Sequence, residues 1–245
     1  MINIVIPMAG LGSRFSKAGY EKPKPFIDVD GKPMIVRVLE NLNYPNAHYI
    51  LLGRSEHLLK EVDLVDQIKR TKNATFVQID NLTEGTACTV LHARELINNN
   101  TPLLIANSDQ IIDIDISDYI SDALARDLDG SILTFIDEHR DPKWSFAKLD
   151  KSGFVAEVKE KVAISENATV GVYFFKTGRS FVNGAVDMIV RNERVNNEFY
   201  TCPVYNYLID TGSKIGIYNI DQNKMHGIGT PDDLNNYLRI LRNAG

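Results

Sequence analysis

The sequence predicts an α/β fold in which a mostly parallel β-sheet carries helices on both faces. Short apolar runs rich in Ile, Val, Phe and Tyr recur along the 245 residues, and each has the length of a strand. Amphipathic stretches of helical length lie between most of these runs, an alternation that is typical of parallel sheets. Hydrophobic residues make up 44% of the chain, which is enough for a substantial core.

Seven apolar runs are predicted to form strands, and five amphipathic stretches are predicted to form helices. The expected strands are residues 3–8, 49–52, 75–79, 103–106, 131–136, 169–175 and 215–220. The expected helices are residues 33–42, 58–72, 86–98, 117–127 and 231–242. Residues 144–149 and 154–158 flank the turn Asp150-Lys151-Ser152-Gly153 and predict a hairpin, so the second part of the sheet should be mixed.

The chain is expected to form a single domain over residues 1–245, because it has no internal repeat, low-complexity tract or linker-like segment. The formal charge of −5 and the scattered basic residues argue against a nucleic-acid partner. Pro7 and Gly10 interrupt the apolar N-terminus, so no membrane span is expected there. Cys88 and Cys202 lie far apart, which favours reduced thiols in a cytoplasmic protein.

A glycine-containing loop follows the first apolar run, at the sheet edge where α/β proteins bind ligands. Gly10 and Gly12 let backbone N–H groups approach a phosphate chain, and Arg14 and Lys24 can neutralise its charge. A dinucleotide-binding fingerprint would need a third glycine and a continuous helix, which Gly19 would break. A Walker A loop would need a Gly-Lys-Ser/Thr element that does not follow. The loop therefore favours a triphosphate.

Three segments at the N-terminus form a composite signature. They are Ala9-Gly-x-Gly-x-Arg14-Phe15, Lys22-Pro-Lys-Pro25 and Gly31-Lys-Pro-Met-Ile35. This signature resembles that of the sugar-1-phosphate nucleotidyltransferases, and the resemblance extends over nearly the whole chain. It implies a Rossmann-like, GT-A-like fold with a nucleotide half at about 1–112 and an acceptor half at 113–245. It also implies a Mg²⁺-dependent enzyme that transfers an NMP unit from an NTP to a phosphorylated acceptor and releases pyrophosphate.

The resemblance assigns roles in the nucleotide half. The loop residues Ala9, Gly10, Leu11, Gly12 and Ser13 would wrap the triphosphate. As the catalytic residues, Arg14 would stabilise the departing pyrophosphate and Lys24 would hold the α-phosphate. The nucleobase and its surroundings would be contacted by Gln78, Gly85, Thr86 and Asn107. From the residues alone, Gly85 permits close approach of a ring, and Thr86 is also explained as a helix cap with nothing bound.

Asp109 follows the fourth apolar run and resembles the family's metal-binding aspartate. Mg²⁺ takes one or two carboxylates together with phosphate oxygens, so one aspartate beside a triphosphate begins a site. Many family members carry a second aspartate where this chain has Gly227, and His226 or Asp221 are the alternatives. Thr230 and the residues after it are explained as a helix cap without any metal.

Two segments of the acceptor half resemble elements of the family: a Glu-Lys pair and a later strand that contains a glycine. The resemblance implies that Glu160 holds an acceptor hydroxyl and Lys161 grips the acceptor phosphate, with Gly171 and Glu198 also lining this pocket. On composition alone the element is equally a solvated charge run, and Lys159 competes for the phosphate contact. Trp144, the sole tryptophan, is a candidate wall of the pocket, although such a residue more often packs in a core.

The sequence thus predicts a nucleotidyltransferase acting on an NTP and a phosphorylated small molecule, most simply a sugar 1-phosphate for nucleotide-sugar or surface-polysaccharide synthesis. The attacking phosphate is already ionised, so no general base is required. Three alternatives stay open: a cytidylyltransferase with a non-sugar phosphate acceptor, an inactive nucleotide-binding relative, and a GT-A glycosyltransferase using Asp113-Ile-Asp115 as an Asp-x-Asp motif. The nucleobase, the acceptor and homo-oligomerisation are left open.

Overall fold

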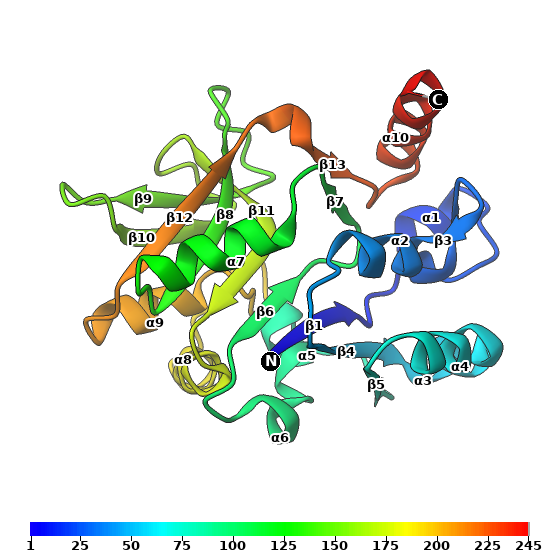
Figure 1. Ribbon diagram of the computed structural model, residues 1–245, viewed down its shortest axis with the longest axis horizontal. Helices are drawn as coiled ribbons and strands as arrows, with labels where there is room; N and C mark the ends of the chain where they lie inside the picture. The colour runs from blue at the N-terminus through cyan, green and yellow to red at the C-terminus, as the bar shows by residue number, and fades with distance from the viewer. Residues whose placement is uncertain (245) are drawn as a thin grey trace.

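A nine-stranded mixed sheet forms the centre of the protein in the computed structural model, which describes residues 1–244 (Figure 1). Its strand order is β10-β9-β11-β6-β1-β4-β5, and β8 pairs with both β11 and β12. The strands are β1 (Ile2–Met8), β4 (Ala47–Arg54), β5 (Ala74–Ile79), β6 (Leu103–Ala106), β8 (Gly130–Ile136), β9 (Ser145–Leu149), β10 (Val155–Glu160), β11 (Asn167–Phe175) and β12 (Ile215–Ile220). All seven predicted strands and the predicted hairpin are present.

The two parts of the sheet differ in strand direction. The neighbours β6, β1, β4 and β5 run parallel to one another, whereas β11 is antiparallel to β6, β8 and β9. The hairpin strands β9 and β10 are antiparallel, and β12 is parallel to β8. This confirms a mostly parallel sheet over the first half of the chain and a mixed sheet over the second half.

Helices cover both faces of the sheet, as predicted. One face carries α2 (Met34–Asn41), α3 (Ser55–Lys60), α4 (Val62–Thr71), α7 (Ile116–Ala125) and α10 (Pro231–Ala244). The other face carries α5 (Thr86–Leu91), α6 (Arg94–Ile97), α8 (Gly178–Val190) and α9 (Val204–Asp210). Alternate residues of β1 enter the two cores: Ile4 and Ile6 face the first layer and Val5 faces the second.

The helices differ from the prediction in two ways: two of the predicted helices are divided, and three helices were not predicted. The stretch 58–72 is divided at Glu61 into α3 and α4, and the stretch 86–98 is divided at His92 and Ala93 into α5 and α6. These breaks need no Gly or Pro, so the amphipathic pattern alone does not reveal them. The helices α8, α9 and α1 (Ser13–Lys17) were not predicted. The N-cap of α8, Thr177, accepts a hydrogen bond from Ser180 N at 3.2 Å.

The C-terminal segment returns to the first half of the chain. After β12 it forms β13 (Met225–Gly227), which pairs with β7 (Gln110–Ile112), and it ends in α10 beside α1 (Ser13–Lys17) and α2 (Figure 1). A small hairpin of β2 (Asp28–Val29) and β3 (Lys32–Pro33) precedes α2. Over residues 1–244, no helix combines the length and hydrophobicity needed to cross a bilayer.

Candidate active site

A cavity of ≈ 400 Å³ lies at the ends of β1 and β6. Its lining brings together eight residues that the sequence analysis selected. They are Gly10, Gly12, Ser13, Arg14, Lys24, Thr86, Asn107 and Asp109. Segments that are far apart in the sequence thus meet around one space that contains two cations and one carboxylate.

The two glycines of the first loop act differently. Gly12 has a left-handed backbone with φ +61°, and a Cβ there would lie 2.9 Å from Lys24 Cβ. Gly12 therefore allows both the turn into α1 and the close approach of Lys24. A Cβ on Gly10 would meet none of the described atoms within 4 Å, so this glycine leaves open space on the cavity wall.

Asp109 is held from two sides. Its carboxylate contacts the ammonium group of Lys24, and both side chains are about a fifth exposed, at 23% and 21% respectively. Its backbone carbonyl accepts a hydrogen bond from Ile228 N at 2.9 Å. A Cβ on Gly229 would lie 2.4 Å from Asp109 Oδ2, so the return of the C-terminal segment leaves little freedom for this carboxylate.

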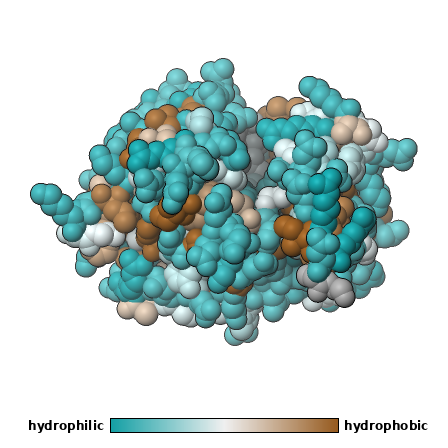
Figure 2. Space-filling model, turned by 90° about the horizontal axis from the view of Figure 1, so that it is seen from above, coloured by the Kyte–Doolittle hydropathy of each residue, from teal (hydrophilic) through white to brown (hydrophobic). Residues whose placement is uncertain are grey.

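A second cavity of ≈ 270 Å³ adjoins the first, and Thr86 and Asn107 line both. It contains the predicted acceptor residues Glu160, Lys161 and Gly171. Seen from above, the surface of the molecule is hollowed between two lobes (Figure 2). The two cavities therefore offer adjacent sites for two ligands.

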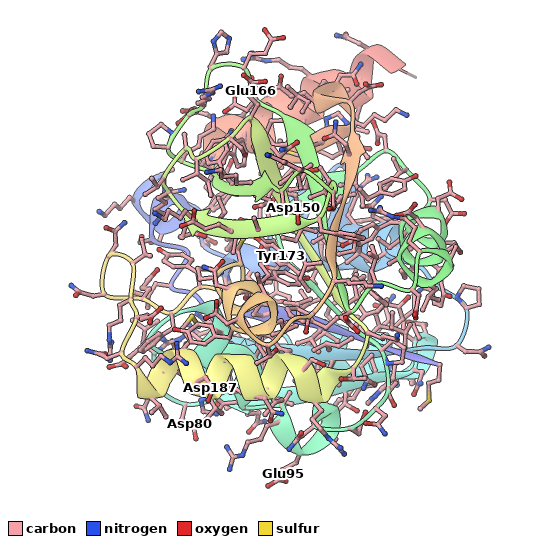
Figure 3. The ribbon with its side chains drawn as sticks, turned by 90° about the vertical axis from the view of Figure 1, so that its left-hand side faces the viewer. Asp80, Glu95, Asp150, Glu166, Tyr173 and Asp187 are labelled. Atoms are coloured by element: carbon pink, nitrogen blue, oxygen red, sulfur yellow. The ribbon has the colours of Figure 1, made fainter. Side chains whose placement is uncertain are left out.

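Glu160 lies at the buried side of the second cavity, with 8% of its surface exposed. The hydroxyl group of Ser145 hydrogen-bonds its carboxylate. Burial raises the pKa of Glu160, and the hydrogen bond from Ser145 opposes this effect only in part. Tyr173, deep inside the molecule in Figure 3, lines the same cavity and shares a 3.2 Å hydrogen bond with Thr169. This part of the cavity is thus polar and shielded from solvent.

Two lysines of the second cavity lie over aromatic rings. Lys161 Nζ donates a 2.7 Å hydrogen bond to the Tyr200 hydroxyl and lies 4.6 Å from the centre of that ring. Lys143 Nζ lies 4.9 Å from the centre of the Trp144 ring and forms an ion pair with the Asp141 carboxylate at 3.1 Å. Lys159 forms a surface ion pair at 3.2 Å and does not line the cavity. Trp144 both walls the cavity and packs edge-on against a core phenylalanine.

Several predicted site residues lie outside both cavities. Ala9 is buried, whereas Leu11 is 59% exposed. Gln78 lines a separate cavity of ≈ 350 Å³ with residues 80–84, 88 and 92. Glu198 is exposed and lies beside Tyr200. The pKa of the Tyr200 phenol is raised, mainly by burial and in addition by the negative charge of Glu198.

Gly85 and Thr86 both contact a distant segment of the chain, which the sequence analysis did not foresee. Gly85 has φ +116°, and a Cβ there would lie 2.4 Å from the backbone oxygen of Phe199. The glycine thus admits a neighbouring chain segment, where we had expected a ring. Thr86 is the first residue of α5 and does not cap it, because its hydroxyl accepts a hydrogen bond from Thr201 N at 3.1 Å.

The position of the expected second aspartate offers no side-chain ligand. A Cβ on Gly227 would meet none of the described atoms within 4 Å, so the space for a side chain is present. His226 is turned away into a 2.7 Å pair with Asp113, and Asp221 is exposed and lines none of the cavities above. Within residues 1–244, no group of three or more His, Cys, Asp or Glu side chains is arranged as a metal site.

The Asp113-Ile-Asp115 segment is occupied by structural contacts. Asp115 is the N-cap of α7 and accepts a 2.8 Å hydrogen bond from Ser117 N, which lowers the pKa of its carboxyl group. Asp113 is paired with His226. Neither carboxylate lines the first or the second cavity.

Sequence reasoning missed several cavity residues. These are Ser108 and Gly229 in the first cavity, and Ser145, Thr169, Tyr173, Tyr200, Thr201 and Cys202 in the second. Ser108 lies beside Asp109 and Tyr200 lies close to Glu198, so their positions carried a signal. Ser145, Thr169 and Tyr173 lie on strands β9 and β11, and no local pattern indicated that these strands meet at a cavity.

Comparison with known families agrees with this arrangement. A family model described as Nucleotidyl transferase matches residues 4–235. The chain therefore belongs to the nucleotidyl transferase family.

The chain is similar to several known members of this class. It is 23% identical over 177 residues to the bifunctional protein GlmU of Methanococcus aeolicus, covering 71% of this chain and 40% of that protein. It is 26% identical over 175 residues to mannose-1-phosphate guanyltransferase beta-A of Xenopus laevis, covering 70% and 49%. The chain thus spans less than half the length of either relative.

Solved structures show the same fold. A nucleoside-diphosphate-sugar pyrophosphorylase from Vibrio cholerae RC9 superposes with a TM-score of 0.79 at 24% identity, covering 96% of this chain and 99% of that one. The inositol-1-phosphate CTP transferase from T. maritima superposes with a TM-score of 0.73 at 14% identity, covering 98% and 94%.

Proposed function

We propose that this protein transfers a nucleoside monophosphate from an NTP to a phosphorylated small molecule, most simply a sugar 1-phosphate, and releases pyrophosphate. The observation that supports this most directly is a pair of joined cavities, each with a cation that lacks a carboxylate partner. Among the ion pairs of residues 1–244, neither Arg14 in the first cavity nor Lys161 in the second has a partner within 4 Å. Unpaired cations of this kind suit two separate phosphate groups.

The reaction needs two anions to approach each other. An oxygen of the acceptor phosphate would attack the α-phosphorus of the NTP as the bond to pyrophosphate breaks, and the nucleophile needs no general base because it is already ionised. Arg14 and Lys24 would bind the triphosphate from one side, and Lys161 would hold the acceptor from the other. Thr86 and Asn107 stand where the two phosphates would meet.

Magnesium is part of the proposal. The residues fit one Mg²⁺ held jointly by Asp109 and phosphate oxygens, because this ion commonly takes a single carboxylate beside a nucleotide. They do not fit a cage of two aspartates, since Gly227 supplies no oxygen from its side chain. A bound Mg²⁺ would neutralise charge on the phosphates, and the lysine on Asp109 would then be released toward the nucleotide.

The proposal is tested by supplying the protein with Mg²⁺, one NTP at a time, and a panel of sugar 1-phosphates, phosphocholine and phosphorylated polyols. Pyrophosphate release that requires one NTP and one acceptor supports the transfer. Release of free nucleoside diphosphate from a nucleotide sugar would instead identify a glycosyltransferase. Binding of NTP without pyrophosphate release from any pair would contradict the proposed reaction.

A further inference from the structure

Lys161 has an unusual surrounding for a lysine that lines a cavity. Its ammonium group has no carboxylate within 4 Å among the described residues, and its polar contact is the neutral hydroxyl of Tyr200. Its backbone lies in the left-handed region with φ +58°, and Lys161 N donates to Trp144 O at 3.1 Å. Non-glycine residues adopt this region only where the surroundings fix them. Both ends of the side chain are therefore constrained.

The surroundings of Tyr200 are equally fixed. The preceding residue, Phe199, donates from its N to Glu84 O at 2.7 Å and accepts at its O from Ala87 N at 2.9 Å. The following residue, Thr201, donates from N to the Thr86 hydroxyl. With a further bond from the Thr201 hydroxyl to the Thr86 hydroxyl, four hydrogen bonds attach the segment 199–201 to residues 84–87, where α5 begins. The backbone on both sides of Tyr200 is therefore fixed to a segment that borders both cavities through Thr86.

We propose that Tyr200 is a positioning residue that holds Lys161 ready for the acceptor phosphate. The phenol hydroxyl accepts one ammonium hydrogen, and the ring stabilises the charge without neutralising it as a carboxylate would. The remaining two ammonium hydrogens stay available to a phosphate. This inference rests on the proposed function for the meaning of the acceptor site, but the contact itself can be tested with a simple phosphomonoester.

The sole tryptophan, Trp144, lines the same cavity, so its fluorescence reports on ligands there. We would titrate the intact protein with methyl phosphate and record the Trp144 emission. Tyr200→Phe keeps the ring and removes the hydroxyl, and we expect the apparent Kd to rise about tenfold, which corresponds to about 1.4 kcal/mol. Tyr44→Phe is the matched control, because Tyr44 lines neither the first nor the second cavity. The Kd of this variant for methyl phosphate should equal that of the wild type.

A double-mutant cycle separates positioning from general damage. If Tyr200 acts through Lys161, then adding Tyr200→Phe to Lys161→Met should not weaken binding further. An equal loss in both backgrounds would overturn the proposal, and so would a Tyr200→Phe titration that matches the wild type.

The two proposals fail in different ways. A wild-type protein that releases no pyrophosphate in the substrate panel contradicts the transfer reaction, whereas the methyl phosphate titration still decides the role of Tyr200. A wild-type emission that does not respond to methyl phosphate overturns the positioning role. With a known substrate pair, Tyr200→Phe should raise KM for the acceptor and leave KM for the NTP unchanged.

Discussion

Replacing Gly229 by alanine should displace the carboxylate of Asp109 from its position while leaving the fold intact. The new Cβ would lie 2.4 Å from Asp109 Oδ2, and ordinary contact begins at 3.4 Å, so the carboxylate must move by about 1 Å. A displacement of this size at a reacting centre costs about 100-fold in rate, or about 2.7 kcal/mol of activation free energy. The obstructing atom ends a flexible side chain, so we expect a loss of only about 1 kcal/mol in stability.

Gly227→Ala is the matched control, because a Cβ there would meet none of the described atoms within 4 Å. Turnover would be followed as pyrophosphate release with the substrate pair that the panel identifies, and stability as the urea midpoint. We expect Gly229→Ala to lose about 100-fold in kcat, and Gly227→Ala to stay within about threefold of the wild type. Wild-type turnover in Gly229→Ala would refute the idea that Asp109 must stay where residue 229 holds it.

Three further predictions follow from the site. Arg14→Ala and Lys24→Ala should each lower kcat about 100-fold, since each removes a preorganised cation, while the melting temperature stays near that of the wild type; near-normal pyrophosphate release at equal melting temperature would contradict their assignment. Gly85→Ala should destabilise the protein by about 3 kcal/mol in urea unfolding, because φ +116° and the backbone of Phe199 both exclude a Cβ. A urea midpoint equal to that of the wild type would show that the segment 199–201 moves to accommodate the Cβ. Burial raises the pKa of Glu160 above 4.5, so the folded protein keeps this proton where the unfolded chain has lost it. The stability linked to Glu160 is therefore complete below pH 4.5 and is lost as pH rises through the folded pKa. Glu160→Gln should thus become more stable relative to the wild type as pH rises above 4.5, and parallel curves of unfolding free energy against pH would contradict this.

The strands could be predicted from the sequence because each is a short apolar run bounded by polar residues, as in Leu103–Ala106. Asp109 could be selected as a candidate site residue because it follows that run, and ligands of α/β proteins bind at the carboxyl ends of strands. The helix α8 could have been found as well. Its buried residues Phe181, Ala185 and Met188 recur at helical spacing after the cap at Thr177.

The remaining features depend on contacts between distant segments, which local patterns do not encode. The need for glycine at position 85 comes from the backbone of Phe199. The environment of Lys161 depends on Tyr200, and nothing in the spacing of these two residues indicates that they touch. The same holds for Gly229 and Asp109, which meet only because β13 pairs with β7.

The attachment of Asp109 to residues 228 and 229 bears on the order in which the protein can mature during synthesis. The parallel strands β1, β4, β5 and β6 are complete once residue 106 has emerged from the ribosome. The aspartate acquires its hydrogen bond to Ile228 only when almost the entire polypeptide is available. A translation product that stops before residue 228 could therefore assemble its parallel strands and still lack the contacts that fix the Asp109 carboxylate.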